Sequence, residues 1–266
     1  MKFFKWLPLI LFFACINVIT QTNFFNSLFF QGGSWMETAR MESMKMGDNS
    51  NDYTLQFWVS GSDVYASDGP ALFSLIDSNG NIKLALSRDS GDSSAISIDI
   101  NSDNMYIPNL EIDWTNADDF YLISILFSNS QGLKGYVNDN IFLDEPDKSV
   151  NVINTKLMIG VIANEQRTIL GNFWYGYMDE IRLWNTWLSD STIQFQTEHP
   201  NKFGEYYRYT EEGEGIETFL DSLIGLWRFN LSEATATIID ESEHGNNGTI
   251  YTLPNFSIEL SNKGTQ

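Results

Sequence analysis

Apolar and polar residues alternate over many short stretches of the chain, which is the pattern of β-strands with one buried face. The segment Tyr53 to Val59 reads YTLQFWV, so its odd-numbered residues all fall on one face. The apolar runs 71–77 and 82–88 flank SNGN, whose Asn79-Gly80 dipeptide favours a tight hairpin turn. Similar runs follow at hairpin spacing over residues 94–100, 120–127, 134–143 and 156–162. This pattern predicts an all-β sandwich of two antiparallel sheets.

The C-terminal third of the chain departs from this pattern and then returns to it. Asp190 to Gln196 reads as a short helical turn, with Ser189 able to cap its N-terminus. Residues 197–221 are acidic and aperiodic, which indicates a connector over the surface. Residues 222–266 regain strand-like chemistry but are too few for a sandwich of their own. We expect them to add strands to the sandwich formed by residues 21–196; the alternative is a poorly ordered tail.

The N-terminus has the pattern of a secretory signal peptide. Lys2 and Lys5 precede a mostly apolar run, Trp6 to Ile19, which is too short to span a bilayer. We expect residues 1–20 to be removed on export, leaving a mature chain from Gln21 without a membrane span. Lipidation of Cys15 is the alternative anchor. Cys15 is the only cysteine, so the mature chain would contain no disulfide and no thiol nucleophile.

Charge narrows the range of partners. The chain has 35 acidic and 15 basic residues, a formal net charge of −20 at pH 7. Such a surface repels phosphate backbones, because nucleic-acid affinity depends on Lys and Arg releasing counterions. Nucleic acid is therefore excluded as an expected partner. Divalent cations suit an acidic chain better, although the same charge also serves solubility.

Several stretches together resemble one family. SLFFQGGSW with YTLQFWV, at 27–35 and 53–59, is similar to the opening of laminin-G-like domains of the concanavalin A-like jelly-roll superfamily. GYMDEIRLW at 176–184 matches its Gly-x-x-Asp-Glu-x-x-x-Trp strand, and 225–251 resembles a terminal strand pair of bacterial members. Where the family has Glu-Gly-x-Gly, this chain has Leu231 to Ala234, so that hairpin is expected to differ. The resemblance implies a jelly-roll β-sandwich.

The resemblance also implies a structural calcium site. It places Asp179 near a sheet edge, where related sandwiches often bind calcium, with carbonyl oxygens of Gly32 and Gly33 as companions. The alternative is that Asp179 hydrogen-bonds backbone amides, since calcium requires six to eight oxygens. Asp179 and Glu180 are adjacent on a strand and should point to opposite faces, so we expect no joint acid/base role. Glu180 is expected to be solvated or paired with Arg182.

A second acidic motif suggests catalysis. Glu111 and Asp113 in LEIDWTN are two residues apart, hence on one face if this is a strand. The laminin-G-like resemblance implies instead that this stretch is the loop before the strand at 120–127. The motif resembles the Glu-x-Asp-x-x-Glu of jelly-roll glucanases, in which two carboxylates flank the scissile bond. The third position here is Asn116, which cannot transfer the catalytic proton. We therefore expect no catalytic residues and no enzyme, with a glucanase-like hydrolase as the remote alternative.

Aromatic residues point to a binding function. They make up 14% of the chain, and exposed rings stack on the apolar faces of sugars. NFWYGY at 172–177 places three rings in a row, and alternation cannot bury all of them. Trp174 and Tyr175 are the expected exposed platform, with Trp35 and Trp187 as further candidates. The alternative is that these rings cover one end of the sandwich; Trp58, Trp184 and Trp227 are assigned to the core.

The sequence thus predicts a secreted or cell-surface binding module without catalytic activity. Glycans are the leading ligand class, with calcium as a possible structural ion. A structural or adhesion module that docks an extracellular protein is the alternative.

Overall fold

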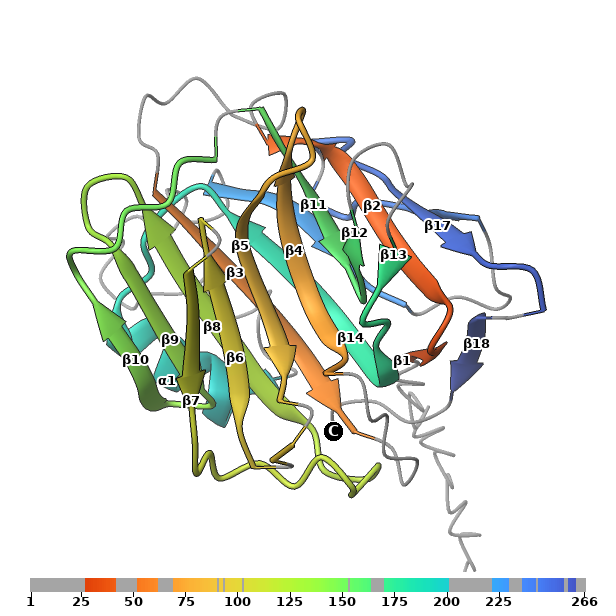
Figure 1. The fold of residues 1–266 in the computed structure, drawn as a ribbon, viewed down its shortest axis with the longest axis horizontal. Coiled ribbons are helices and arrows are strands. Elements are labelled where there is room, and N and C mark those ends of the chain that lie inside the picture. Colours follow the sequence, from red (N-terminus) through yellow and green to blue (C-terminus); the bar gives the residue numbers. More distant parts are fainter. Residues whose placement is uncertain are drawn as a thin grey trace, which may run out of the picture.

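The computed structural model describes residues 27–41, 52–61, 69–89, 91–92, 94–101, 103–152, 154–163, 170–200, 222–229, 236–242, 244–255 and 258–261. Two eight-stranded antiparallel sheets stack face to face, with a two-stranded hairpin beside them (Figure 1). The predicted jelly-roll sandwich is confirmed. The predicted signal peptide and nearly all of the predicted connector lie outside the described residues.

The first sheet has the central strand order β10-β9-β8-β3-β14-β1-β18, and β15 also pairs with β14. Its strands are β1 (Ser27–Gln31), β3 (Asp52–Ser60), β8 (Tyr121–Ser128), β9 (Leu133–Val137), β10 (Asn140–Glu145), β14 (Tyr175–Trp184), β15 (Leu223–Trp227) and β18 (Ile258–Ser261).

The second sheet has the order β16-β17-β2-β11-β4-β5-β6-β7. Its strands are β2 (Ser34–Arg40), β4 (Ala71–Asp77), β5 (Ile82–Arg88), β6 (Ile96–Ile100), β7 (Asp103–Ile107), β11 (Thr155–Ile159), β16 (Thr237–Ile238) and β17 (Gly248–Thr252). The separate hairpin pairs β12 (Ile162–Ala163) with β13 (Leu170–Gly171). The predicted turn at Asn79-Gly80 joins β4 to β5, and Gly80 has the positive φ, 85°, that this turn requires.

The core between the sheets is built from the alternating residues that the sequence pattern selected. Tyr53, Leu55, Phe57 and Val59 of β3 are all fully buried there. The other face of β3 is buried too. α1 (Asp190–Glu198) covers part of it, where Gln56 donates to Gln196. The predicted helical turn is confirmed, with Ser189 Oγ accepting the N–H of Thr192 at 3.2 Å.

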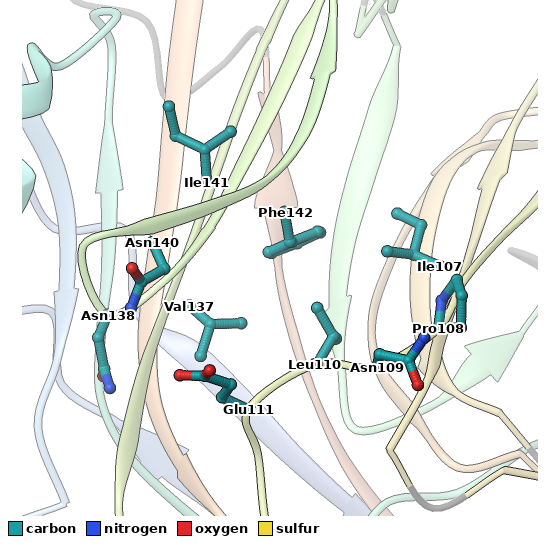
Figure 2. A pocket seen from close by; sticks show the side chains of 10 residues that line it. All are labelled: Ile107, Pro108, Asn109, Leu110, Glu111, Val137, Asn138, Asn140, Ile141 and Phe142. Atoms are coloured by element: carbon teal, nitrogen blue, oxygen red, sulfur yellow. The ribbon is translucent and has the colours of Figure 1, made fainter.

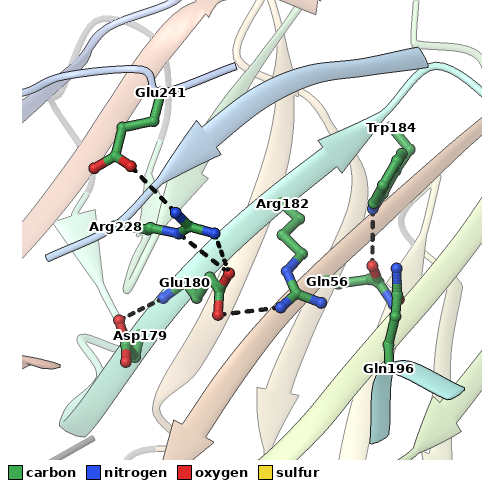
Figure 3. Close-up of polar contacts among 8 residues, drawn as sticks. All are labelled: Gln56, Asp179, Glu180, Arg182, Trp184, Gln196, Arg228 and Glu241. Carbon is green, nitrogen blue, oxygen red and sulfur yellow. Dashed lines mark hydrogen bonds and ion pairs between the residues drawn. The ribbon is translucent and has the colours of Figure 1, made fainter. Parts of the chain in front are cut away.

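A polar network under α1 fixes the helix to the sheet (Figure 3). Gln56 of β3 accepts the indole N–H of Trp184 at 2.8 Å and donates to Gln196 of α1 at 2.6 Å and to Ser124 at 3.0 Å. Trp184 is fully buried on this outer face, together with Ile193 of α1. α1 is nine residues long, and within the described ranges no helix has the length and apolar character to cross a bilayer.

The C-terminal residues contribute strands to both sheets. β15 pairs with β14, β18 with β1, and β17 with β2. Asp240 organises the turn between β16 and β17: its carboxylate accepts the backbone N–H groups of Leu226, Ser242 and Asn246 and the hydroxyl of Ser242. Trp227 lies in the core between the sheets and donates its indole N–H to Asn246 O at 2.8 Å.

Candidate ligand-binding site

Two of the four predicted platform residues are buried. Trp174 is 0% exposed and packs edge-on against Trp114 in the core, with ring centroids 5.6 Å apart. The backbone N–H of Trp174 donates to Gly160 O at 2.8 Å, and its backbone carbonyl accepts the N–H of Gly32 at 3.1 Å. These backbone contacts hold Trp174 before β14 begins, with its side chain in the core. The prediction that Trp174 is exposed is therefore wrong.

Trp35 is also buried, at 4% exposure, on the outer face of the second sheet. It stacks on Tyr251 with a centroid distance of 5.4 Å and donates to Glu37 Oε1 at 3.0 Å. The expectation that Trp35 belongs to an exposed platform is wrong, because β17 brings Tyr251 over its ring.

The other two predicted residues are half-buried in separate clusters. Tyr175 belongs to a group of rings with Phe29 and Tyr177, at centroid distances of 5.4 Å and 4.7 Å from Phe29. Trp187 packs instead against the cluster beneath α1. The four residues therefore do not form one platform.

The residues implied as calcium ligands do not fit one ion. Gly32 is hydrogen-bonded to Trp174, whereas Asp179 lies five residues further along the chain in β14. At about 3.3 Å per strand residue this separation is about 16 Å. Ligands of a single calcium lie about 2.3–2.6 Å from it, hence within about 5 Å of one another. The Gly33 carbonyl also accepts the N–H of Leu253, and β14 is an interior strand rather than a sheet edge.

Asp179 and Glu180 instead belong to a buried ionic cluster (Figure 3). Glu180 has a φ of 46° and lies at an irregularity in the pairing of β14 with β3, where β14 has one extra residue. The extra residue breaks the alternation and brings both acidic side chains to the outer face of the first sheet. The prediction that they point to opposite faces is wrong for this reason.

The cluster holds the C-terminal segment to β14. Glu180 pairs with Arg182 at 3.1 Å and with Arg228 at 3.1 Å, and Arg228 also reaches Glu241 at 3.4 Å. Asp179 accepts the N–H of Glu180 at 2.7 Å, and burial, followed by the nearby Glu180 charge, raises the pKa of Asp179 to about 8. Glu180 is buried, so of its two expected states pairing with Arg182 is the one observed. The geometry is that of a structural cluster rather than a ligand site.

A pocket opens at the side of the sandwich where β7 of one sheet faces β9 and β10 of the other (Figure 2). It has a volume of about 370 Å³. One wall is the loop after β7, and the other is the β9–β10 hairpin. Its lining residues are Ile107, Pro108, Asn109, Leu110, Glu111, Val137, Asn138, Asn140, Ile141 and Phe142.

Backbone irregularities in both walls create the hollow. Asn109 and Asn138 have φ values of 60° and 54°, a left-handed conformation that asparagine tolerates better than most residues. In β10 an extra residue between Ile141 and Leu143 lets Phe142 face inward as well. Its ring packs over Gly135, where a Cβ would approach to 2.5 Å. Ile141 is left 51% exposed at the rim.

The pocket combines apolar walls with polar groups that are not engaged elsewhere. Figure 2 shows Glu111 near Val137 on one side and Asn109 with Ile107 on the other. No hydrogen bond or ion pair within the described part of the chain engages the side chains of Asn109, Glu111 or Asn140. The side chain of Asn138 is engaged, because its Oδ1 accepts the backbone N–H of Leu122 at 2.9 Å. Uncommitted donors and acceptors beside apolar side chains are typical of small-ligand sites.

The glucanase-like interpretation required Glu111 and Asp113 on one face of a strand, whereas the laminin-G-like resemblance implied a loop, and the structure agrees with the loop. Glu111 and Asp113 lie in the loop between β7 and β8, not on a strand. The side chain and N–H of Thr115 donate to Asp113 at 2.7 Å and 3.0 Å, and these bonds lower the pKa of Asp113. Glu111 alone lines the pocket. Sequence reasoning singled out Glu111 but missed the pocket, because its two walls come from segments that only the sandwich brings together.

Comparison with known families agrees with this architecture. Residues 30–194 match the family model described as the concanavalin A-like lectin/glucanases superfamily, which confirms the resemblance seen in the sequence. No curated protein gives a significant match.

This chain is similar to several solved structures at low sequence identity. A Bacteroides ovatus protein described as a candidate carbohydrate-binding protein is 14% identical, with a TM-score of 0.56 over 88% of this chain and 59% of that chain. Trypanosoma rangeli sialidase, in complex with 2,3-difluorosialic acid, is 13% identical, with a TM-score of 0.50 over 66% of this chain and 28% of that one. The carbohydrate-binding module CBM40 of a Ruminococcus gnavus sialidase, bound to α2,3-sialyllactose, is 9% identical, with a TM-score of 0.48 over 65% and 98% of the two chains. This chain thus spans little more than half of the Bacteroides protein.

Proposed function

Because the chain belongs to the concanavalin A-like lectin/glucanases superfamily, we propose that it is an exported glycan-binding module without catalytic activity. The observation that carries the proposal is the pocket between β7 and the β9–β10 hairpin. Apolar side chains in its lining, such as Leu110 and Ile141, can contact the C–H face of a sugar ring. Its amides can donate to and accept from sugar hydroxyls, and the Glu111 carboxylate can accept from them.

The lining of the pocket supports binding rather than hydrolysis. Glycoside hydrolysis in its common form uses two carboxyl groups on either side of the scissile bond. Glu111 is the one carboxylate among the lining residues, and Asp113 is committed to its own turn. Release of reducing sugar from oligosaccharides by the wild-type protein would revive the glucanase-like alternative.

The rim of the pocket offers a clean test of the proposal. We expect Ile141→Ala and Asn140→Ala each to weaken glycan binding about tenfold, the effect of losing about 1.4 kcal/mol of contact. Both residues are exposed, so the melting temperature should stay unchanged. Ile239→Ala is the matched control, because Ile239 is 56% exposed and lies by β16, at the opposite end of the second sheet from β7.

The measurement is a glycan array of the mature chain followed by titration calorimetry on the best ligand. Equal losses in the control and the rim variants would remove the pocket from the proposal. A blank array from a well-folded protein would overturn glycan binding. It would favour docking of a protein partner, for which the half-exposed rings of Phe29, Tyr175 and Tyr177 on a sheet face are the supporting observation.

Export and calcium are subsidiary parts of the proposal. Export rests on the charged and apolar pattern of residues 1–20, which lie outside the described residues. A stabilising calcium ion would need ligands other than the set Asp179, Gly32 and Gly33. Thermal unfolding with calcium and with chelator tests for such an ion, because a ligand of the native state must raise its melting temperature.

A further inference from the structure

The two chain segments that form the pocket contain acidic residues but no Lys, Arg or His. Glu111 is the one ionisable group among the lining residues. Residues 89–133, which include the first wall, contain no Lys, Arg or His, and neither do residues 135–147, which include most of the second. Both stretches carry exposed acids close to the rim, namely Asp113 and Asp139.

Arg88 directly precedes the first of these stretches. It lies on β5 at 2% exposure and is not among the lining residues, and its charge contributes to the lowered pKa of Asp113.

The two lysines that flank the second stretch are engaged elsewhere. Lys134 pairs with Asp190 of α1 at 3.1 Å, on the outer face of the first sheet. Lys148 lies 3.8 Å from Asp103, at the start of β7, whereas the pocket begins at its end, Ile107. Four strand residues at about 3.3 Å each separate these two ends of β7 by about 13 Å. Neither lysine is positioned to neutralise an anion inside the pocket.

We infer that this pocket takes uncharged sugars and rejects carboxylated or sulfated ones. The inference rests on the proposed function and specifies its ligand class. Proteins that hold sugar carboxylates or sulfates do so with charge-assisted hydrogen bonds, most often from Arg or Lys. Here the ligand anion would instead lie beside the Glu111 carboxylate, and the net charge of −20 adds a longer-range repulsion.

The polar groups of the pocket match an uncharged polyol. The amides of Asn109 and Asn140 can each donate and accept, and Glu111 accepts from hydroxyl groups. The volume of about 370 Å³ is near the lower end of the range for small-ligand pockets, roughly 300–1,000 Å³. A terminal sugar or a short segment fits this size better than a long chain.

The experiment compares matched pairs of glycans on the full mature chain. Each neutral probe is tested beside its charged counterpart: lactose with 3′-sulfolactose, xylobiose with aldobiuronic acid, and a neutral galactan fragment with its sulfated form. We expect any neutral glycan that binds to do so at least tenfold more tightly than its charged counterpart. The difference in affinity between the neutral and the charged glycan should become smaller at high salt, because salt screens the part of the repulsion that acts through solvent.

Glu111→Gln tests the role of the carboxylate. It keeps the size and an acceptor but removes the charge. We expect weaker binding of the neutral glycan, because a charge-assisted hydrogen bond is lost, and a ratio of neutral to charged affinity that falls about fivefold. Glu259→Gln is the control, because it makes the same change on β18, at the opposite edge of the first sheet from β10.

Each outcome separates this inference from the proposed function. Charged counterparts that bind as tightly as the neutral glycans would overturn the inference and leave glycan binding standing. An equal effect of both glutamate variants would overturn the assignment of selectivity to Glu111. A chain that binds neither member of any pair would overturn both the inference and the proposed function.

Discussion

Asp179 illustrates how one residue is governed by its surroundings rather than by its own chemistry. Its carboxyl group is 4% exposed, and burial raises its pKa from 3.8 to about 8. In the unfolded chain the group ionises near its ordinary value, so the folded state holds its proton over a wider pH range. The contribution of Asp179 to stability is therefore complete below about pH 4 and is lost as pH rises towards 8.

Asp179→Asn should consequently raise stability at alkaline pH. Asparagine keeps an oxygen that can accept the N–H of Glu180, but it carries no charge to bury. At pH 8–9 we expect the variant to have the higher melting temperature and a free energy of unfolding larger by up to several kcal/mol. Both differences should vanish towards pH 4. Thermal unfolding from pH 4 to 9 measures it, with Asp139→Asn at an exposed turn as the control. A variant less stable than wild type at pH 9 would contradict this account.

At the scale of elements, α1 shows how a short helix is held on a sheet. Gln56 bonds at once to Trp184, Gln196 and Ser124, and all of these groups are buried. The helix itself was predictable, because its cap and its length are set by neighbouring residues. The network was not, because its four members come from β3, β8, β14 and α1.

Removing the centre of this network should be costly. Gln56→Ala leaves the Trp184 indole N–H and the Gln196 carbonyl without these bonds, so we expect a loss of about 2–4 kcal/mol in the free energy of unfolding. Gln194→Ala makes the same change on the exposed face of α1 and should cost less than about 0.5 kcal/mol. Urea denaturation followed by tryptophan fluorescence compares the two variants. Similar losses in both would mean that the network does not stabilise the docking of α1.

At the scale of the whole molecule, the sandwich extends beyond the matched family region. The family match ends at residue 194, yet β15, β17 and β18 pair with strands of both sheets, and Trp227 is fully buried in the core. A chain ending at Pro200 would expose the edges of β14, β1 and β2 and remove Trp227 from the core. We expect this truncation to lose cooperative thermal unfolding. Calorimetry compares the truncated and full mature chains. A sharp transition in the truncated chain would show that residues 21–200 fold alone.

The sequence by itself determined the fold class and most of the elements. The alternation in β3, the Asn79-Gly80 turn and the Ser189 cap depend on residues within a few positions of one another, so local rules read them correctly. The strand Gly176 to Trp184 and the matches around it determined the family on the same basis. Chemistry confined to one segment is visible in that segment.

The tertiary structure decided which side chains face outward and where a ligand site exists. Trp174 is buried because its backbone is bonded to Gly32 and Gly160, and Glu180 shares a face with Asp179 because β14 has an extra residue there. The pocket joins Glu111, in the loop after β7, to Asn140 of β10 in the other sheet. These features depend on contacts between segments far apart in the chain. The alternation of apolar and polar residues along one strand carries no information about such contacts.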